Sequence, residues 1–253
     1  MLDATVILNL YRRPQHLAMQ IEALRNQTFP PKEIWIWVNY HEDNEDVDFQ
    51  KFNVNRVIDC SYNFKFYGRF AGALLADTKY VTIIDDDTIP GSKWLQNCID
   101  TYFELEKKGY TTPILTTAGV TLNSMQYQNH SRCGWPTQNK ETTQVDIGCQ
   151  SWFFNRECLS HLWREKPIMW DNGEDIQLSY CSQKYGGVQT FCPPHPPEDK
   201  ELWGSLHAIE LGVDEVATSN NTWLSHSKFF SQRDKIVKNA LANGWQTIKN
   251  ITL

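Results

Sequence analysis

The sequence lacks a surplus of positive charge and any long apolar run. Its 253 residues include 24 Lys and Arg against 30 Asp and Glu, which gives a net charge of −6. Nucleic-acid-binding domains usually carry a basic surplus, so we expect no nucleic-acid partner. No stretch approaches the roughly 20 apolar residues that a membrane-spanning helix needs, so we expect no membrane span in this chain.

The sequence also lacks a cysteine pattern of the kind that holds zinc or forms a disulfide scaffold. The seven cysteines are odd in number and contain no C-x-x-C pair. We expect small buried thiols in a reducing compartment. The opening residues MLDATVILNLYRRP show neither the basic start nor the apolar run of a signal peptide. We therefore expect a cytoplasmic protein, and one domain of a longer multidomain protein would show the same features.

What the first half has is an alternation of strand-like and helix-like segments. Strands are predicted over 4–11, 33–40, 55–60 and 80–84, and helices after Pro14, over 66–77 and over 92–109. This alternation predicts an α/β fold with a mixed, mainly parallel sheet flanked by helices. In such sheets, ligands bind outside the carboxyl ends of the strands.

The second half is less regular. Strands are predicted over 114–120 and 145–156, helices over 173–187 and 231–244, and loops over 123–143 and 192–204. Neither an internal repeat nor a linker-like segment interrupts the chain. We therefore expect a single domain over residues 1–253.

Three consecutive aspartates, Asp85 to Asp87, follow the predicted strand 80–84. Adjacent carboxylates repel one another and resist burial, so something must compensate them. Mn²⁺ or Mg²⁺ would do so, because hard cations prefer oxygen ligands. In strand geometry Asp85 and Asp87 point the same way and could serve one metal ion. The alternative is a solvated acidic turn.

The surrounding segment YNFKFYGRFAGALLADTKYVTIIDDDTIP resembles the centre of GT-A nucleotide-sugar glycosyltransferases, both family 2 and the exostosin-like branch. In family 2 the order is an Asn, an Arg and a Gly on a helix, and an apolar strand that ends in D-x-D. Here these are Asn63, Arg69, Gly72 and Asp85 to Asp87. The opening ILNLYRRPQHLAMQIEALRNQTFPPKEIWIWVN resembles the first βαβ unit of the same families.

The resemblance implies a GT-A fold, with residues 1–91 as the nucleotide-binding half and residues 92–253 as the acceptor-binding half with a C-terminal helix. It also implies a set of nucleotide contacts: Leu10, Tyr11, Arg12, Asn39, Arg69, Asp85 and Asp86. A guanidinium such as that of Arg69 can hold a diphosphate with two hydrogen bonds. A surface ion pair with Asp77 or another acid is the alternative for Arg69.

A second acidic motif, Glu174-Asp175, begins the predicted helix 173–187. Acids in a first turn oppose the helix dipole, so capping alone could explain them. GT-A enzymes carry an x-E-D motif at the corresponding place, and in inverting members its Asp deprotonates the acceptor hydroxyl. The resemblance implies that Asp175 is this base and that Glu174 helps to orient the acceptor or the base. Inversion is favoured over retention.

The same resemblance suggests residues near the sugars and a third metal ligand. Gly148 and Trp152 lie in the segment that approaches the donor sugar and the acceptor, and Trp170 adds a stacking surface. Core packing is the alternative there, and we expect it for Phe153 and Phe154. A C-terminal His commonly completes the metal site in this fold. His195, His207 and His226 are the candidates, and His226 has the right position in the order, so the predicted metal ligands are Asp85, Asp87 and His226.

The sequence thus indicates a metal-dependent transferase that moves a sugar from a nucleoside diphosphate sugar, expected to be a UDP-sugar, to a glycan acceptor. Two other functions stay open. A nucleotidyltransferase or sugar-phosphate pyrophosphorylase would share the fold and the metal, although no glycine-rich phosphate loop occurs near the N-terminus. A non-catalytic carbohydrate-binding module would keep the fold without the reaction.

Overall fold

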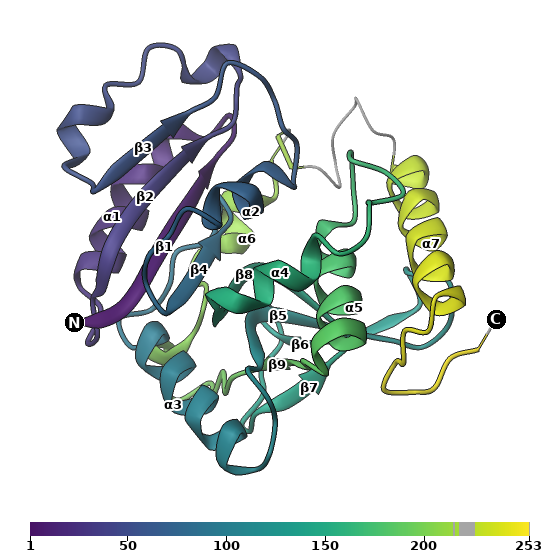
Figure 1. Ribbon diagram of the computed structural model, residues 1–253. Coiled ribbons are helices and arrows are strands. Elements are labelled where there is room, and N and C mark those ends of the chain that lie inside the picture. Colours follow the sequence, from purple (N-terminus) through teal and green to yellow (C-terminus); the bar gives the residue numbers. More distant parts are fainter. Residues whose placement is uncertain (215, 218–225, 253) are drawn as a thin grey trace.

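The computed structural model describes residues 1–214, 216–217 and 226–252, except for the side chains of residues 208, 226 and 227. A single mixed sheet runs through it, in the order β3-β2-β1-β4-β8-β5-β9-β7, with β6 paired to β5 (Figure 1). The strands are β1 (Leu2–Leu10), β2 (Pro31–Val38), β3 (Arg56–Asp59), β4 (Tyr80–Ile84), β5 (Ile114–Leu122), β6 (His130–Gly134), β7 (Thr143–Val145), β8 (Ile147–Asn155) and β9 (Thr190–Cys192).

Helices cover both faces of this sheet. The α-helices are α1 (Leu17–Arg25), α2 (Gly68–Ala73), α3 (Trp94–Lys107), α4 (Leu159–Leu162), α5 (Glu174–Gly186), α6 (Ala208–Gly212) and α7 (His226–Ala242). Short 3₁₀ helices are η1 (Pro14–His16), η2 (Glu42–Asn44), η3 (Phe49–Phe52), η4 (Arg156–Cys158) and η5 (Lys200–Leu202). The expected α/β fold with a mixed sheet between helices is confirmed.

The strand β1 is buried on both faces from Ala4 to Leu10, because it lies in the middle of the parallel half. Val6 and Leu8 belong to one core cluster, together with side chains of α1 and α3. Ile7 points to the other face and belongs to a second cluster, with side chains of α2 and α4. Burial on both faces is typical of strands in the parallel part of a sheet that helices cover on both sides.

The helix α2 can lie close to β2 because its glycines have no side chain that would collide with Trp37. A Cβ at Gly72 would lie 2.6 Å from the ring of Trp37, and a Cβ at Gly68 would also lie 2.6 Å from it. The helix is shorter than the predicted 66–77, because residues after Ala73 continue in tighter i→i+3 turns, as the bond from the Ala76 N–H to the Ala73 carbonyl shows. This approach carries Arg69 to the carboxyl end of β4.

Several elements of the second half were not predicted. The expectation of a loop over 123–143 is wrong in part, because β6 pairs antiparallel with β5 from His130↔Leu122 to Gly134↔Ala118. Its residues are polar and carry no apolar run that would have signalled a strand. The three-residue strands β7 and β9 are too short to give a periodic pattern.

The antiparallel strand β8 joins the two halves of the sheet. It pairs with β4, with Ile84 opposite Ser151, and also with β5. The backbone contact continues one residue beyond β4, where the Asp85 N–H donates to the Gln150 carbonyl at 2.9 Å. The aspartates are therefore placed beside residues of the second half. None of the helices in the described residues combines the length and apolar character needed to cross a bilayer.

Candidate active site

A cavity of about 420 Å³ opens at the carboxyl ends of β1, β2 and β4. Its wall brings together most of the predicted site residues: Tyr11, Asn39, Arg69, Asp85, Asp86, Asp87, Trp152, Glu174 and Asp175. Four predicted residues do not belong to the wall: Leu10, Arg12, Gly148 and Trp170. The side chain of His226, the first residue of α7, lies outside the described part of the structure.

Arginines compensate the three aspartates. Arg13 Nη1 lies 2.7 Å from Asp86 Oδ1 and 3.4 Å from Asp87 Oδ2. Arg69 Nη1 forms an ion pair with Asp85. The triplet is a turn, closed by the bond from the Thr88 N–H to the Asp85 carbonyl at 3.1 Å, rather than an extension of the strand. The expectation of strand geometry for Asp85 and Asp87 is therefore wrong, although both side chains still reach the cavity.

The backbone of this turn is held from α1 and the residues before it. Gln20 Nε2 donates to the carbonyl of Asp85 at 2.8 Å and to that of Thr88 at 3.1 Å. His16 Nδ1 donates to the carbonyl of Asp86 at 2.8 Å. These bonds fix the direction in which the three carboxylates leave the chain.

Arg69 connects the two acidic motifs. Its side chain is buried, with 3% of the residue exposed, and it lies over the Trp152 ring at 5.2 Å from the centroid. Besides Asp85, it pairs with Glu174, with 3.0 Å between Nη2 and Oε1. The alternative of a surface pair with Asp77 is wrong, since Asp77 lies near Arg156 instead, at 3.8 Å.

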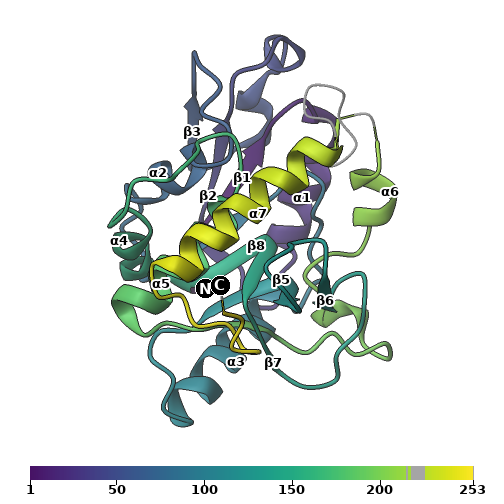
Figure 2. The ribbon, with the colours of Figure 1, turned by 90° about the vertical axis from the view of Figure 1, so that its right-hand side faces the viewer.

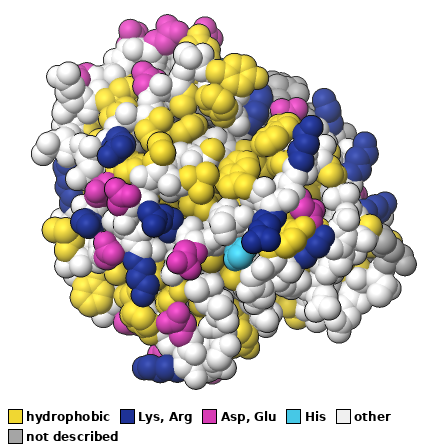
Figure 3. All heavy atoms as spheres, in the orientation of Figure 1, with side chains coloured by type: hydrophobic (Ala, Val, Ile, Leu, Met, Phe, Trp, Pro, Cys, Tyr) yellow, Lys and Arg dark blue, Asp and Glu magenta, His cyan; other side chains and the backbone are white. Residues whose placement is uncertain are grey.

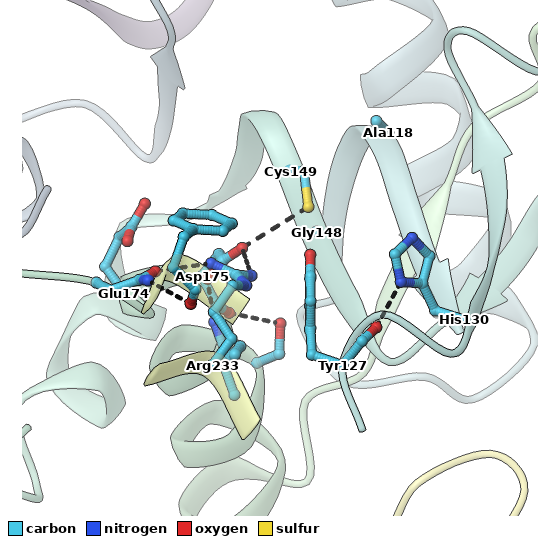
Figure 4. A network of polar contacts seen from close by, with 12 residues as sticks. Ala118, Tyr127, His130, Gly148, Cys149, Glu174, Asp175 and Arg233 are labelled. Carbon is cyan, nitrogen blue, oxygen red and sulfur yellow. Dashed lines mark hydrogen bonds and ion pairs between the residues drawn. The ribbon is translucent and has the colours of Figure 1, made fainter. Parts of the chain in front are cut away.

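The acidic pair Glu174-Asp175 forms the first turn of α5, directly after Gly173 at φ 85°. Asp175 Oδ1 accepts the N–H of Ile176 at 2.8 Å, and its Oδ2 lies 2.5 Å from Arg233 Nη2 (Figure 4). The acids therefore do more than oppose the helix dipole, because each one also forms a buried ion pair with an arginine from a distant segment.

Burial raises the pKa of three of these carboxyl groups, because the neighbouring arginines do not fully offset the cost of burying the charge. Burial, opposed by Arg69, raises the pKa of Asp85 to about 6, and burial, opposed by Arg13, raises that of Asp86 to about 7. Burial and the neighbouring Asp175 raise the pKa of Glu174 to about 7. A raised pKa means that the arginines only partly stabilise the ionised forms. An additional cation at this place would be favourable.

Two arginines of the site have no motif in the sequence that identifies them. In the pair Arg12-Arg13, the resemblance pointed to Arg12, but that residue has φ 67° and pairs with Asp43 near the surface at 2.9 Å. Arg13 is the buried one, and it also holds Asp214 with a shortest distance of 2.5 Å. Arg233 comes from α7, far from either acidic motif in the chain.

Of the residues predicted to contact the nucleotide or the sugars, some line the cavity and others lie in the core or outside the cavity wall. The Asn39 carboxamide is occupied, since it donates to Asn63 Oδ1 at 2.7 Å and accepts the N–H of Phe64 at 2.8 Å. Leu10 lies in the core. The Gly148 carbonyl accepts the indole N–H of Trp152 at 2.8 Å. Trp170 is 47% exposed and packs edge-on against Tyr67 outside the cavity wall.

The remaining candidate residues lie in the core or at the surface, away from the cavity wall. Phe153 and Phe154 lie in the core, as expected. His195 is fully buried, where its Nδ1 donates to the Pro193 carbonyl at 2.8 Å and its Nε2 accepts the N–H of Gly204 at 3.1 Å. His207 lies beside Glu210 at 3.1 Å on the surface.

The family model for glycosyl transferase family 2 matches residues 5–163 of this chain. The chain belongs to glycosyl transferase family 2. It is therefore a glycosyltransferase with a GT-A fold. The match includes the three aspartates and ends before Glu174, Asp175 and Arg233. Among curated proteins, no sequence is significantly similar to this chain.

Solved structures share the fold of this family 2 chain at low identity. S. aureus TarS 1–349 in complex with UDP-GlcNAc has a TM-score of 0.55 and 14% identity, over 96% of this chain and 80% of that one. S. aureus TarS 1–349 alone gives 0.54 and 16%, over 95% and 71%. The mannosyltransferase PcManGT from Pyrobaculum calidifontis, in complex with GDP-Man and Mn²⁺, gives 0.54 and 16%, over 76% and 55%.

The bridge made by Arg69 yields a prediction for stability. Arg69→Met leaves the buried Glu174 and the partly buried Asp85 without their shared cation, so we expect a loss of about 3–5 kcal/mol in the free energy of unfolding. The control is Lys32→Met, which removes an exposed pair with Asp3 at 3.7 Å and should change stability by about 0–1 kcal/mol. Urea unfolding measures both. Equal, small losses in the two variants would contradict the buried bridge.

The raised pKa of Glu174 predicts a pH dependence of stability. The folded protein holds this proton more tightly than the unfolded chain does, so the contribution is present at low pH and is lost as pH rises through about 7. In metal-free buffer, we expect the Tm of the wild type to fall more between about pH 5 and about pH 7.5 than that of Glu174→Gln. Thermal unfolding checks this, and a steeper fall in the Gln variant would contradict it.

Proposed function

We propose that this family 2 glycosyltransferase moves a sugar from a UDP-sugar to a hydroxyl group of a glycan acceptor, with inversion and with help from Mn²⁺ or Mg²⁺. The observation that carries the proposal is that one cavity holds the D-x-D aspartates and the Glu174-Asp175 pair, joined by Arg69. The residues that bind the donor and those that bind the acceptor must lie close together, because the acceptor oxygen must reach the anomeric carbon of the bound donor.

The donor would lie against the first half of the chain, residues 1–91. Tyr11 and Asn39 line the cavity beyond β1 and β2, and we assign the nucleoside to that side. UDP is favoured because a solved structure with this fold contains UDP-GlcNAc, although another contains GDP-Man. In this proposal, Arg69 acts mainly through Asp85 and Glu174, since both of its terminal nitrogens are occupied by carboxylates.

The residues of the D-x-D turn fit a divalent cation. Asp85 and Asp87 offer only oxygen donors, their side chains are 27% and 20% exposed, and both line the cavity. Gly212 leaves room beside them, since a Cβ there would lie 2.6 Å from Asp87 Oδ2. When bound, the cation would neutralise the diphosphate as it leaves. We keep His226 as the proposed third ligand.

The acceptor would lie against the second half, residues 92–253, where Asp175 is the proposed base. Its carboxylate takes the proton of the acceptor hydroxyl while the oxygen forms a bond to the anomeric carbon and the bond to the nucleoside diphosphate breaks. Glu174 helps to hold the acceptor. Aromatic side chains near the cavity offer stacking surfaces for sugar rings. Trp135 and Trp152 line the cavity wall, and Figure 3 shows hydrophobic side chains gathered on one face of the molecule.

We also propose a cytoplasmic location, with which the cysteines agree, since all seven are free thiols.

A screen of donors can identify the donor sugar. A pyrophosphorylase or a binding module would use the same cavity without transferring a sugar to an acceptor, so the test must detect the released nucleotide.

The test is a donor screen with the purified protein, Mn²⁺ and a panel of UDP-, GDP- and CMP-sugars, read as release of free nucleotide. We expect release from one UDP-sugar, loss of that release in Asp87→Ala, and roughly a 10²–10⁴-fold slower transfer to acceptor in Asp175→Asn. The control is Asp100→Ala, an exposed acid on α3. No release from any donor, together with no thermal stabilisation by nucleotide and metal, would overturn the proposal.

A further inference from the structure

The helix α7 rests directly on the start of α5, where Asp175 lies. In Figure 2 it crosses the side of the molecule in front of β8. Asn172 Nδ2 donates to the carbonyl of Phe229 at 3.2 Å and to Gln232 Oε1 at 3.3 Å. A Cβ at Gly173 would lie 2.2 Å from Ile236 Cδ1, and its φ of 85° also favours glycine. The residues before Asp175 are thus shaped to receive this helix.

One side chain of α7 reaches Asp175. Arg233 is buried, with 4% of the residue exposed, and lines the cavity. Its Nη2 lies 2.5 Å from Asp175 Oδ2, and its Nη1 donates to Asn172 Oδ1 at 3.1 Å. The guanidinium also lies over the Tyr127 ring, 4.1 Å from the centroid, as Figure 4 shows. These contacts hold the guanidinium in one position.

The ion pair with Arg233 engages Oδ2 of Asp175. The other oxygen, Oδ1, accepts the N–H of Ile176 at 2.8 Å. With both oxygens engaged, the carboxylate has one orientation at the cavity wall. Arg233 also places a positive charge beside Asp175. Glu174 is paired with a different arginine, Arg69, which it shares with Asp85.

We propose that Arg233 is a positioning residue for the reaction: it fixes Asp175 in the orientation that accepts the proton from the acceptor hydroxyl. The inference rests on the proposed function, in which Asp175 is the base. It assigns a role to α7, which lies beyond the residues 5–163 that the family model matches. Arg233 acts through Asp175, so removing it should slow transfer without weakening donor binding.

The experiment is a double-mutant cycle on transfer to acceptor, with Arg233→Met, Asp175→Asn and the double variant. We expect Arg233→Met to lower kcat by roughly 10²-fold, because small displacements of a reacting group have effects of that size. The KM for the donor should stay within about threefold of the wild type. In the Asp175→Asn background, Arg233→Met should cause no further loss, because the residue that it orients has already lost its function.

Two further variants separate positioning from a general effect on folding. Arg233→Lys keeps the charge and one donor nitrogen, so it should recover part of the rate that Arg233→Met loses. Lys235→Met removes an exposed cation from the same helix and should leave kcat unchanged. Equilibrium binding of UDP and Mn²⁺ to Arg233→Met, equal to that of the wild type, would show that the cavity has remained folded.

Three results would overturn the inference. Independent, additive losses in the double variant would show that Arg233 does not act through Asp175. A loss confined to donor KM would make Arg233 a donor contact. An inactive wild type would remove the base role of Asp175 and this inference with it, and that failure is seen before any variant is compared.

Discussion

The site depends on the two ion pairs that the buried guanidinium of Arg69 forms. The guanidinium lies between Asp85, at the end of β4, and Glu174, at the start of α5, so it joins residues that are 89 positions apart in the chain. Without a cation at this place, the two carboxylates would face each other across a poorly solvated space, where like charges are costly. Arg13 extends the same principle to Asp86 and Asp87, and Arg233 extends it to Asp175.

The packing of the protein serves this arrangement. Gly68 and Gly72 let α2 lie against Trp37, which brings Arg69 close to β4. The antiparallel pairing of β4 with β8 then brings Gln150 and Trp152 of the second half beside the aspartates. Residues of the two halves, which we propose to bind donor and acceptor, thus meet at one edge of the sheet. Charge compensation by arginine is only partial, as the raised pKa values of Asp85, Asp86 and Glu174 indicate.

The sequence could predict what local pattern determines. The alternation of predicted strands and helices indicates the parallel half, and the acids that follow β4 indicate the edge where ligands bind. The order of Asn63, Arg69 and Asp85 to Asp87 pointed to the family, which the family model confirms. The polar strand β6 and the burial of Arg13 at the cavity wall were not predictable, because tertiary contacts decide both. Arg233 has no motif around it, and only the docking of α7 places it at Asp175.

The central claim is that the D-x-D turn and the Glu174-Asp175 pair form one metal-assisted transferase site. A crystal structure with Mn²⁺ and UDP, with the metal located by anomalous scattering, tests it most directly. The account predicts Mn²⁺ at roughly 2.0–2.2 Å from a carboxylate oxygen of Asp85 or Asp87 and from the diphosphate, inside the cavity that Asp175 lines. Mn²⁺ bound instead at the surface group His41, Glu42 and Asp43, with UDP away from the three aspartates, would contradict it.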